Sequence, residues 1–224
     1  TIEQIKEKIE IATILGTFQS TLTDFPYLRK IWVKNAEEER LLGVSLTGIY
    51  DSKLFNDPCD KGIKERLLSL RDHAIDTNNV LADKLGINPA AAITCVKPSG
   101  TVSQLCDSAS GIHPRHSNYY IRRVRADNKD PLTQFMKDKG VPWEADVMKP
   151  DSTTVFSFPQ KAPKGAVVRD DIDAIKHLEL WAVYQEAWCE HKPSVTINVK
   201  DDEWMKVGAW VYDHFDEMSG VSFL

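Results

Sequence analysis

The sequence predicts an α/β fold in which a mostly parallel sheet has its strands joined by crossover helices. Short apolar, β-branched runs alternate along the chain with segments of helical periodicity, and this alternation is typical of parallel sheets. No internal repeat, low-complexity tract or Gly/Ser-rich linker divides the 224 residues. We therefore expect a single domain over residues 1–224, with about six strands and about five helices forming a half-barrel or an open sheet.

In the first half of the chain we expect two long helices and two buried strands. Residues 2–22 carry apolar side chains at helical spacing, and residues 62–85 read as a long helix closed by Gly86. The runs RLLGVSLTGIY (40–50) and AAITCVKPSG (91–100) are apolar and partly β-branched, so each predicts a strand. A short helix is expected to follow from Thr101 to Leu105.

The same alternation continues in the second half. NYYIRRVRA (118–126) and STTVFSFPQ (152–160) predict strands, and between them a helix is expected with Asp130 as N-cap and Pro131 at its first position, ending at Gly140. A helix over 171–190 is followed by a strand at 194–199, a helix over 201–215 and a last strand at 220–224. The residues expected to be buried by the 171–190 helix are Ile175, Leu178, Ala182 and Tyr184 or Trp181.

Composition places the chain among ordinary globular proteins, with 42% hydrophobic and 27% charged residues. The net charge of -5 argues against a protein that coats nucleic acid, but it is compatible with a nucleotide pocket. No apolar run approaches the ~20 residues of a membrane span, and the charged N-terminal segment is unlike a signal peptide. The cytoplasm is the expected location.

The four cysteines, at positions 59, 95, 106 and 189, form no CxxC pair. This spacing excludes a zinc ribbon and argues against a disulfide framework, so each is expected to be a buried or reduced thiol. The chain starts inside an amphipathic pattern at Thr1 and stops in an apolar, strand-like run. From these two ends we expect a fragment of a larger protein, with an exposed sheet edge that associates with a partner or with itself.

The stretch CVKPSGTVSQLCDSASGIHP (95–114) holds the candidate chemistry. Its first part follows a strand and enters a helix: Gly100 allows close approach of a ligand, Ser99 and Thr101 offer hydroxyls, and Lys97 adds charge. The N–H groups at a helix start favour an anion such as phosphate. The P-loop spacing is absent, and a strand–Gly–helix corner is also a common structural turn, so both interpretations remain open.

The same stretch offers two further alternatives. His113 and the nearby His116 could bind a metal or act as a base, although no convergent Cys/His set accompanies them. Cys95 and Cys106 could form a redox pair, although Cys106 shares a predicted helix face with Val102 and Leu105, which favours packing.

Other polar and aromatic clusters have simpler explanations. Strand alternation puts Arg122 and Val124 on one side and Arg123 and Arg125 on the other, either as solvated arginines or as an anion contact. The acidic runs DDEW and RDDID lie at helix starts, where carboxylates cap the helix. The tryptophans at 181, 188, 204 and 210 are expected to be core or interface anchors.

Several of these segments together resemble a known family. LLGVSLTGI, ITCVKPSGTVSQLCDSASGIHPRHSNYYIRRVRADNKDPL, CEHKPSVTINVKDDEW and GVSFL occur in that order. They resemble the large catalytic chain of ribonucleotide reductases, in the form found in the adenosylcobalamin-dependent (class II) enzymes of bacteria and phages. The resemblance implies the C-terminal half of a ten-stranded α/β barrel. It also implies reduction of the 2′-carbon of a ribonucleotide by a thiyl radical, with adenosylcobalamin as the radical source and a thiol reductant system.

The resemblance also implies roles for residues of this chain. The substrate phosphates would bind at Pro98, Ser99, Gly100, Thr101 and Val102. The pocket beside the substrate would be formed by Ser110, Gly111, Ile112 and His113. The strand around Ser45 and Gly48 would line the barrel interior.

The family motif Asn-Pro-Cys-Gly-Glu, which carries the radical cysteine and a glutamate, does not occur in the sequence. No catalytic residue is therefore assigned, and the chain alone is expected to be inactive without an N-terminal part of the reductase. Two alternatives are a non-catalytic module that binds a nucleotide or phosphate, and a fragment of a class I reductase large chain. No nucleic-acid or membrane partner is expected.

Overall fold

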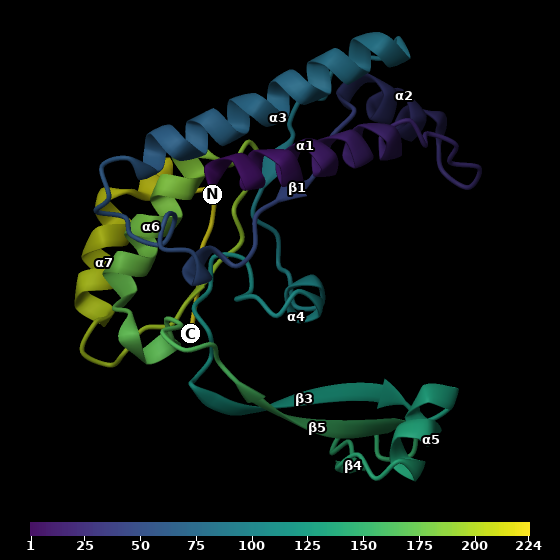
Figure 1. The fold of residues 1–224 in the computed structure, drawn as a ribbon, viewed down its shortest axis with the longest axis vertical. Helices are drawn as coiled ribbons and strands as arrows, with labels where there is room; N and C mark the ends of the chain where they lie inside the picture. The colour runs from purple at the N-terminus through teal and green to yellow at the C-terminus, as the bar shows by residue number, and fades with distance from the viewer. The chain divides into compact units, whose positions relative to one another are not determined.

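The computed structural model describes all of residues 1–224, and the chain falls into two compact units. One unit combines Thr1–Pro114 with Asp171–Leu224, and the other is the intervening segment Arg115–Asp170. The single domain expected over 1–224 is thus interrupted by an inserted segment that packs on itself. Figure 1 shows the course of the chain through both units.

The first unit contains five helices and four short strands. Its elements are α1 (Ile2–Gln19), α2 (Lys30–Glu39), β1 (Val44–Ser45), α3 (Ile63–Leu85), β2 (Thr94–Cys95), α4 (Val102–Leu105), α6 (Ala174–Ala187), β6 (Thr196–Ile197), α7 (Trp204–Asp213) and β7 (Ser222–Phe223). Here α4 is a single turn, and it is counted apart from the five longer helices.

Both strand pairs of this unit are parallel, as the sequence predicts. β2 pairs with β1, with Thr94 opposite Val44, and β6 pairs with β7. Along the other edge of β2 the amide of Glu190 donates to the Thr94 carbonyl (3.0 Å) and the amide of Ser194 donates to the Val96 carbonyl (2.8 Å). The 190–194 segment therefore runs beside β2 in the same direction and leads into β6.

Side chains that follow α6 complete the hydrogen bonding of β2. The buried Trp188 indole donates to the Cys95 carbonyl (2.8 Å). The Glu190 carboxylate accepts from the backbone amides of Ile93 (2.9 Å) and Thr94 (3.2 Å). These bonds supply partners to backbone groups that water does not reach, which a buried strand requires.

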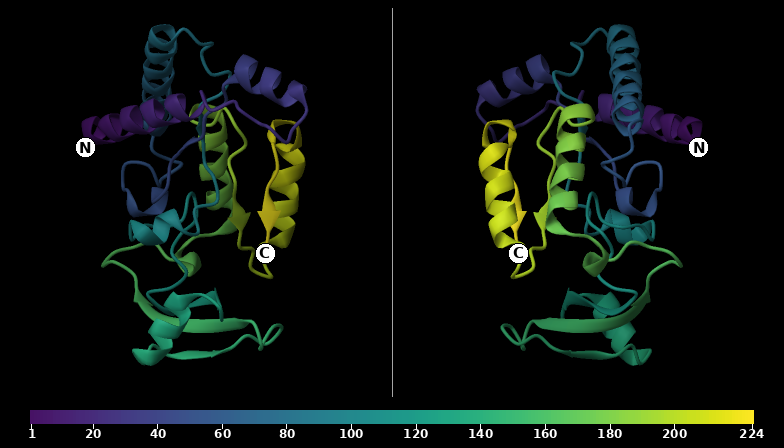
Figure 2. Two further views of the ribbon diagram at one scale, coloured as in Figure 1. Left: turned by 90° about the vertical axis from the view of Figure 1, so that its right-hand side faces the viewer. Right: turned by 90° about the vertical axis from the view of Figure 1, so that its left-hand side faces the viewer.

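The core of the unit is built around α6. Leu178, Trp181 and Tyr184 are buried as predicted, whereas Ile175 and Ala182 are partly exposed. The helix buries side chains around most of its circumference because it packs against α3 and α7 (Figures 1 and 2). Such a helix is apolar on more than one face, which explains its position inside the unit.

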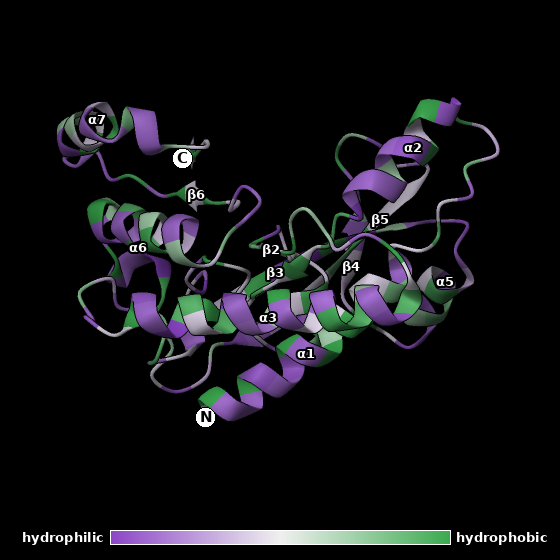
Figure 3. Ribbon diagram, turned by 90° about the horizontal axis from the view of Figure 1, so that it is seen from above, coloured by the Kyte–Doolittle hydropathy of each residue, from purple (hydrophilic) through white to green (hydrophobic).

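A buried polar contact joins α1 to α3. Asn78, which is 1% exposed, donates to the Thr17 hydroxyl (2.9 Å) and accepts from the Ala90 amide (2.8 Å). Thr17 in turn donates to the Thr13 carbonyl (2.8 Å). Apolar and polar residues alternate around α3 in Figure 3, as expected for a helix with one buried face. Asn78 thereby connects both helices to the segment that enters β2.

A second buried polar group, His177 on α6, contacts the segment that follows α4. Its Nε2 donates to the Ile112 carbonyl (2.8 Å), and its ring meets those of Tyr50 and His113 edge-on. Burial is the main cause that lowers the pKa of His177 to about 4, so the ring is neutral near neutral pH.

The inserted unit is antiparallel, which differs from the mostly parallel sheet predicted for the whole chain. It comprises β3 (Tyr119–Asp127), α5 (Pro131–Asp138), β4 (Trp143–Ala145) and β5 (Thr153–Lys161), with the strand order β3-β5-β4. The amide of Asn128 donates to the Ser152 carbonyl (2.9 Å), so the chain leaves β3 and enters β5 at the same end of the sheet. A connection that returns to its starting end gives antiparallel strands, whereas parallel strands need a crossover.

Most predicted elements are present, with differences at their ends. Asp130 caps α5 as predicted, and Gly86 ends α3 in the left-handed conformation (φ 66°). The strands of the first unit are only two residues long. Helix α2 was not predicted, and none of its side chains is buried. Trp181 and Trp188 are core residues, whereas Trp204 is about half exposed (47%).

None of the helices combines the length and the apolar character needed to cross a membrane.

Replacement of Asn78 by Ala should destabilise the first unit. The substitution removes two hydrogen bonds and leaves the Ala90 amide without its acceptor, so we expect a loss of about 2 kcal/mol in the free energy of unfolding. Urea denaturation measures this loss. Asn35→Ala, at an exposed position of α2, is the matched control and should change the value by less than about 0.5 kcal/mol. Equal effects of the two substitutions would contradict the role of Asn78.

Acid should destabilise the fold through His177. Its pKa is about 4 in the folded chain and near the ordinary value of 6.5 when unfolded. Between these values the unfolded state binds a proton that the folded state does not, so stability is complete above the unfolded pKa and falls as pH is lowered. The free energy of unfolding, compared near pH 7.5 and near pH 5, should lose about 2 kcal/mol through this group.

His177→Gln should remove this part of the pH dependence. His116→Gln, which alters an exposed histidine, should retain it. Identical pH profiles for the wild type and the His177→Gln variant would show that His177 does not contribute.

Candidate functional site

Two loops leave the carboxyl ends of neighbouring strands and meet. Residues 46–48 follow β1, and residues 96–101 follow β2 and lead to α4. Since the strands are parallel, both loops emerge at the same edge of the sheet, where α/β folds usually bind ligands. The Ser45 hydroxyl, exposed in this chain, accepts from the Lys97 amide (2.9 Å) and fixes the start of the second loop.

A cluster of three hydroxyls lies where these loops meet the 109–111 segment. The Thr47 and Ser99 hydroxyl oxygens are 2.8 Å apart, and those of Ser99 and Ser110 are 3.2 Å apart. Thr47 also donates to the Ala109 carbonyl (3.1 Å) and accepts from the Gly111 amide (2.8 Å). The structure thus brings Ser99 of the predicted phosphate loop together with Ser110 and Gly111 of the predicted pocket.

Backbone conformation at two glycines permits this approach. Gly48 (φ 73°) and Gly111 (φ 54°) are in the left-handed region, which favours glycine. A Cβ at Gly111 would lie 3.3 Å from the Lys97 carbonyl oxygen, so the two loops pack closely there. The predicted Gly100 differs, because a Cβ at this position would meet no atom of the chain within 4 Å.

The start of α4 presents backbone donors to this region. α4 has no side-chain N-cap, and no hydrogen bond within the chain uses the amides of Thr101 or Val102. Pro98, Gly100, Thr101 and Val102 are exposed, and Ser99 is partly buried by its hydroxyl contacts. Unused amides at a helix start carry partial positive charge and suit an anionic ligand.

His113 is held as a neutral structural group. Its Nε2 accepts from the Thr196 amide (2.9 Å), so the proton is on Nδ1, which donates to the Ser110 carbonyl (3.0 Å). Burial is the main cause that lowers the pKa of His113. With both ring nitrogens engaged, His113 offers no lone pair to a metal or to a substrate proton, and Ile112 beside it is fully buried. This geometry favours the pocket-wall interpretation.

The cysteines are all free thiols, and two predictions about them have different outcomes. Cys95 is buried as expected, and burial is the main cause that raises its pKa. Cys106 was expected to pack and is exposed, so that prediction was wrong. The reason is that the single turn of α4 buries Ser103, while the side of Val102 and Leu105 faces outward.

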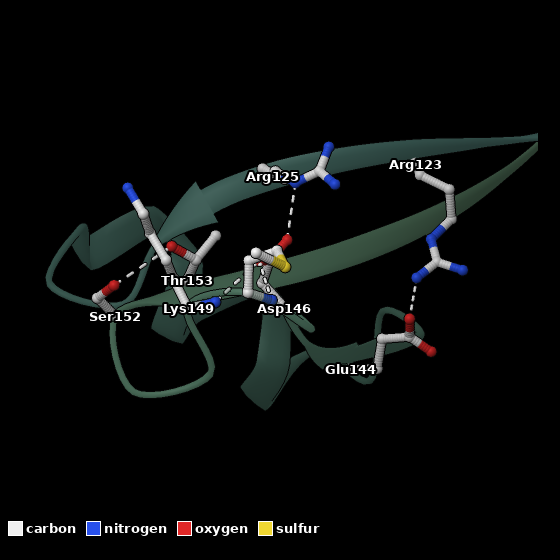
Figure 4. Close-up of polar contacts among 8 residues, drawn as sticks. Arg123, Arg125, Glu144, Asp146, Lys149, Ser152 and Thr153 are labelled. Atoms are coloured by element: carbon white, nitrogen blue, oxygen red, sulfur yellow. Dashed lines mark hydrogen bonds and ion pairs between the residues drawn. The ribbon is translucent and has the colours of Figure 1, made fainter.

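Two arginines of β3, Arg123 and Arg125, form ion pairs within the inserted unit. Arg123 pairs with Glu144, and the Arg125 Nε donates to Asp146 (2.7 Å), as Figure 4 shows. The hydrogen bond from Arg125 is the first of several that lower the pKa of Asp146, whose side chain is 7% exposed. Both arginines lie on one face of β3, as alternation predicts, and they serve as cross-strand partners of β4 and its flank.

No group of three or more metal-ligating side chains converges anywhere in the chain. Sequence reasoning missed three residues of the site: Thr47, His177 and Asp51, whose carboxylate accepts from the Ala109 amide (2.7 Å). Thr47 precedes Gly48 near the end of the predicted strand 40–50, and Asp51 directly follows that strand, so their positions were an available signal. His177 carried none, because a histidine inside an apolar helix has no distinctive spacing.

Comparison with known proteins gives the context of this site. No protein-family model matches the chain. Three curated proteins, each named adenosylcobalamin-dependent ribonucleoside-triphosphate reductase, are similar to it. They come from Lactobacillus acidophilus (29% identity; 89% of this chain, 30% of the relative), Lactobacillus gasseri (26%; 98% and 33%) and Euglena gracilis (26%; 100% and 33%). The chain thus spans about a third of the length of these relatives.

A solved structure supports the same relationship. The crystal structure of a B12-dependent (class II) ribonucleotide reductase matches 98% of this chain and 34% of its own, with a TM-score of 0.80 at 24% identity. This match confirms the predicted fold class, a part of an α/β barrel, and the sequence matches confirm the resemblance. The chain is therefore homologous to a part of the adenosylcobalamin-dependent ribonucleoside-triphosphate reductases and has the fold of the matching part of the class II enzyme.

Proposed function

We propose that the chain is the part of an adenosylcobalamin-dependent ribonucleotide reductase that holds the phosphates of the substrate. The loop from Pro98 to Val102 is the observation that carries this proposal, because the amides of Thr101 and Val102 have no acceptor in the chain and the Ser99 hydroxyl lies beside them at the carboxyl end of β2. In the whole enzyme, the ribonucleotide would be reduced at its 2′-carbon by a thiyl radical.

Each group of the loop has a defined task in this proposal. The amides of Thr101 and Val102 would donate to phosphate oxygens, and Gly100 would let a phosphate approach the backbone, since no atom of the chain occupies that side. Lys97, exposed beside the loop, would add positive charge. Ser110 to His113 would form the wall next to the substrate. A triphosphate is the substrate class we propose, because the relatives are named triphosphate reductases.

The radical chemistry would be supplied by other parts of the enzyme. The 224 residues contain no Asn-Pro-Cys-Gly-Glu motif. Burial is also the main cause that raises the pKa values of Cys95 and Cys189, and a thiol with a raised pKa is a poor redox group. We therefore propose that the radical cysteine and the cysteine pair served by a thiol reductant lie in the remaining two thirds of such an enzyme.

Adenosylcobalamin, when bound, supplies the radical in this proposal. The residues of the candidate site do not fit a role in binding it, because both ring nitrogens of His113 are engaged and His177 donates to a carbonyl. No residue of this chain is assigned to the cofactor.

The exposed apolar side of α4 supports the proposal that another polypeptide covers this part of the chain. Val102 is 60% and Leu105 is 87% exposed, next to the proposed phosphate loop. Such side chains beside a polar site are typical of a surface covered by more protein. We propose that the rest of the reductase covers them, and that self-association is the alternative when the chain is alone. The cytoplasm, where ribonucleotides are available, is the proposed location.

A non-catalytic module that binds a phosphate-containing ligand is the second candidate function. The hydroxyl and amide cluster supports it, since neither needs radical chemistry to bind an anion. It differs from the first candidate in that a complementing reductase part should have no effect on it.

Gly100→Ala should weaken phosphate binding without loss of stability. The added Cβ meets no atom of the chain and φ is not left-handed, so the free energy of unfolding should change by less than about 0.5 kcal/mol. The methyl group would occupy the proposed phosphate position, so the Kd for inorganic tripolyphosphate should rise roughly tenfold. Isothermal titration calorimetry measures the Kd.

Gly208→Ala is the matched control for this substitution. Its added Cβ also meets open space, but it lies in α7, so tripolyphosphate binding should be unchanged. An unaltered Kd in the Gly100→Ala variant would contradict the proposed phosphate position.

The purified chain should form no deoxyribonucleotide from ribonucleoside triphosphates with adenosylcobalamin and a dithiol reductant. Addition of a reductase polypeptide that carries the Asn-Pro-Cys-Gly-Glu motif but lacks the part homologous to this chain should restore turnover. Product analysis by chromatography checks both statements. Turnover by the chain alone would contradict the proposal that the radical cysteine lies outside this chain. Binding of tripolyphosphate without any restored turnover would favour the non-catalytic module.

A further inference from the structure

We propose that Thr47 is a positioning residue that orients the hydroxyls of Ser99, in the phosphate loop, and Ser110, in the pocket wall, and does not itself touch the ligand. This inference rests on the proposed function of residues 98–102. Thr47 lies after β1, far from the loop in sequence, and its hydroxyl makes contacts with Ser99, Ala109 and Gly111. Its side chain therefore joins the loop after β1 to the loop after β2 and to the segment after α4.

Only one assignment of the hydroxyl protons of Thr47, Ser99 and Ser110 makes all four of these contacts hydrogen bonds. The Ala109 carbonyl can only accept, so the one hydroxyl proton of Thr47 goes to it (3.1 Å). The Gly111 amide can only donate, so it takes one lone pair of Thr47 (2.8 Å). The contact with Ser99 (2.8 Å) then requires Ser99 to donate to the other lone pair. Because the Ser99 proton is used in the bond to Thr47, Ser99 accepts a hydrogen bond from Ser110 (3.2 Å).

The direction of this chain assigns different tasks to the two serines. The Ser99 proton is committed to Thr47 by a short bond, so Ser99 is held in place and presents a lone pair. The Ser110 proton is held by the longest contact of the series, beyond the usual range for O–H···O bonds. The Ser110 hydroxyl can therefore turn from Ser99 and donate its hydrogen bond to an arriving phosphate oxygen, because only a weak bond is lost. Ser110, rather than Ser99, is therefore the hydroxyl donor to the ligand.

The backbone around Thr47 makes its hydroxyl a rigid reference point. The amide of Gly48 donates to the Ala109 carbonyl (2.7 Å), and the amide of Ile49 donates to the Gly111 carbonyl (3.3 Å). These bonds fix the register between residues 47–49 and 109–111 on both sides of the Thr47 hydroxyl. A methyl group in place of the hydroxyl would leave the Gly111 amide without an acceptor and would release the Ser99 proton.

Three variants test the inference by titration with inorganic tripolyphosphate. Thr47→Val removes the hydroxyl at nearly constant shape and should raise the Kd roughly tenfold. Thr47→Ser keeps the oxygen and should rescue binding to within about threefold of the wild type. Thr13→Val removes a buried, hydrogen-bonded hydroxyl from α1, remote from the site, and should leave the Kd unchanged. Equal Kd values for the wild type and the Thr47→Val variant would overturn the inference while the proposed function stands.

A double-mutant cycle separates positioning from direct contact. If Thr47 acts through Ser99, then Thr47→Val should change the Kd less than about threefold when Ser99 is already Ala. A full tenfold effect in the Ser99→Ala background would show that Thr47 acts on the ligand by itself, and would overturn the inference.

Amide hydrogen exchange without ligand keeps the two proposals distinguishable. The Gly111 amide should exchange at least about tenfold faster in Thr47→Val than in Thr47→Ser, because only the serine keeps its acceptor. If wild-type chain fails to bind tripolyphosphate, the proposed function is wrong, and this exchange difference still decides whether Thr47 orders the loop. Equal exchange in both variants would overturn the positioning role.

Discussion

The hydrogen bonding of the buried β2 backbone is the constraint on which the rest of the first unit depends. A strand enclosed on both faces must find backbone partners on both edges, and β2 finds them in β1 and in the 190–194 segment. The Glu190 carboxylate and the Trp188 indole add bonds at its start and at Cys95. The loops after β1 and β2 are consequently held next to each other, and the site is a product of this arrangement.

The proposed anion site on this frame consists of neutral groups. Its hydroxyls and backbone amides carry no net charge, and its two histidines are kept neutral by burial. In a chain with a net charge of -5, dipoles fixed by the fold can attract an anion locally where the overall field does not. The two histidines connect the site to neighbouring elements through hydrogen bonds. His113 ties the 110–113 segment to β6, and His177 ties it to α6.

The sequence similarity and the candidate site together support the proposal that this chain is one part of a reductase. The chain spans about a third of the length of its reductase relatives, and its candidate site offers hydroxyls and backbone amides. Its thiols are either buried with raised pKa values or exposed without a partner cysteine. The inserted unit, with its arginines paired across the antiparallel sheet, adds a separately packed body to this part of the barrel.

The sequence by itself determined the α/β class, the parallel order of the first unit, the caps at Asp130 and Gly86, and the Pro98–Val102 loop as a candidate anion site. These follow from local periodicity and turn chemistry, which neighbouring residues specify. Tertiary structure decided the antiparallel insertion, the outward side of α4 with Cys106, and the contacts of Thr47 and His177. The contacts of Thr47 with Ser99 and of His177 with Ile112 join residues that are more than fifty positions apart in the sequence, and no local pattern encodes such a meeting. The state of His113 likewise depends on a distant residue, because the Thr196 amide donates to its Nε2.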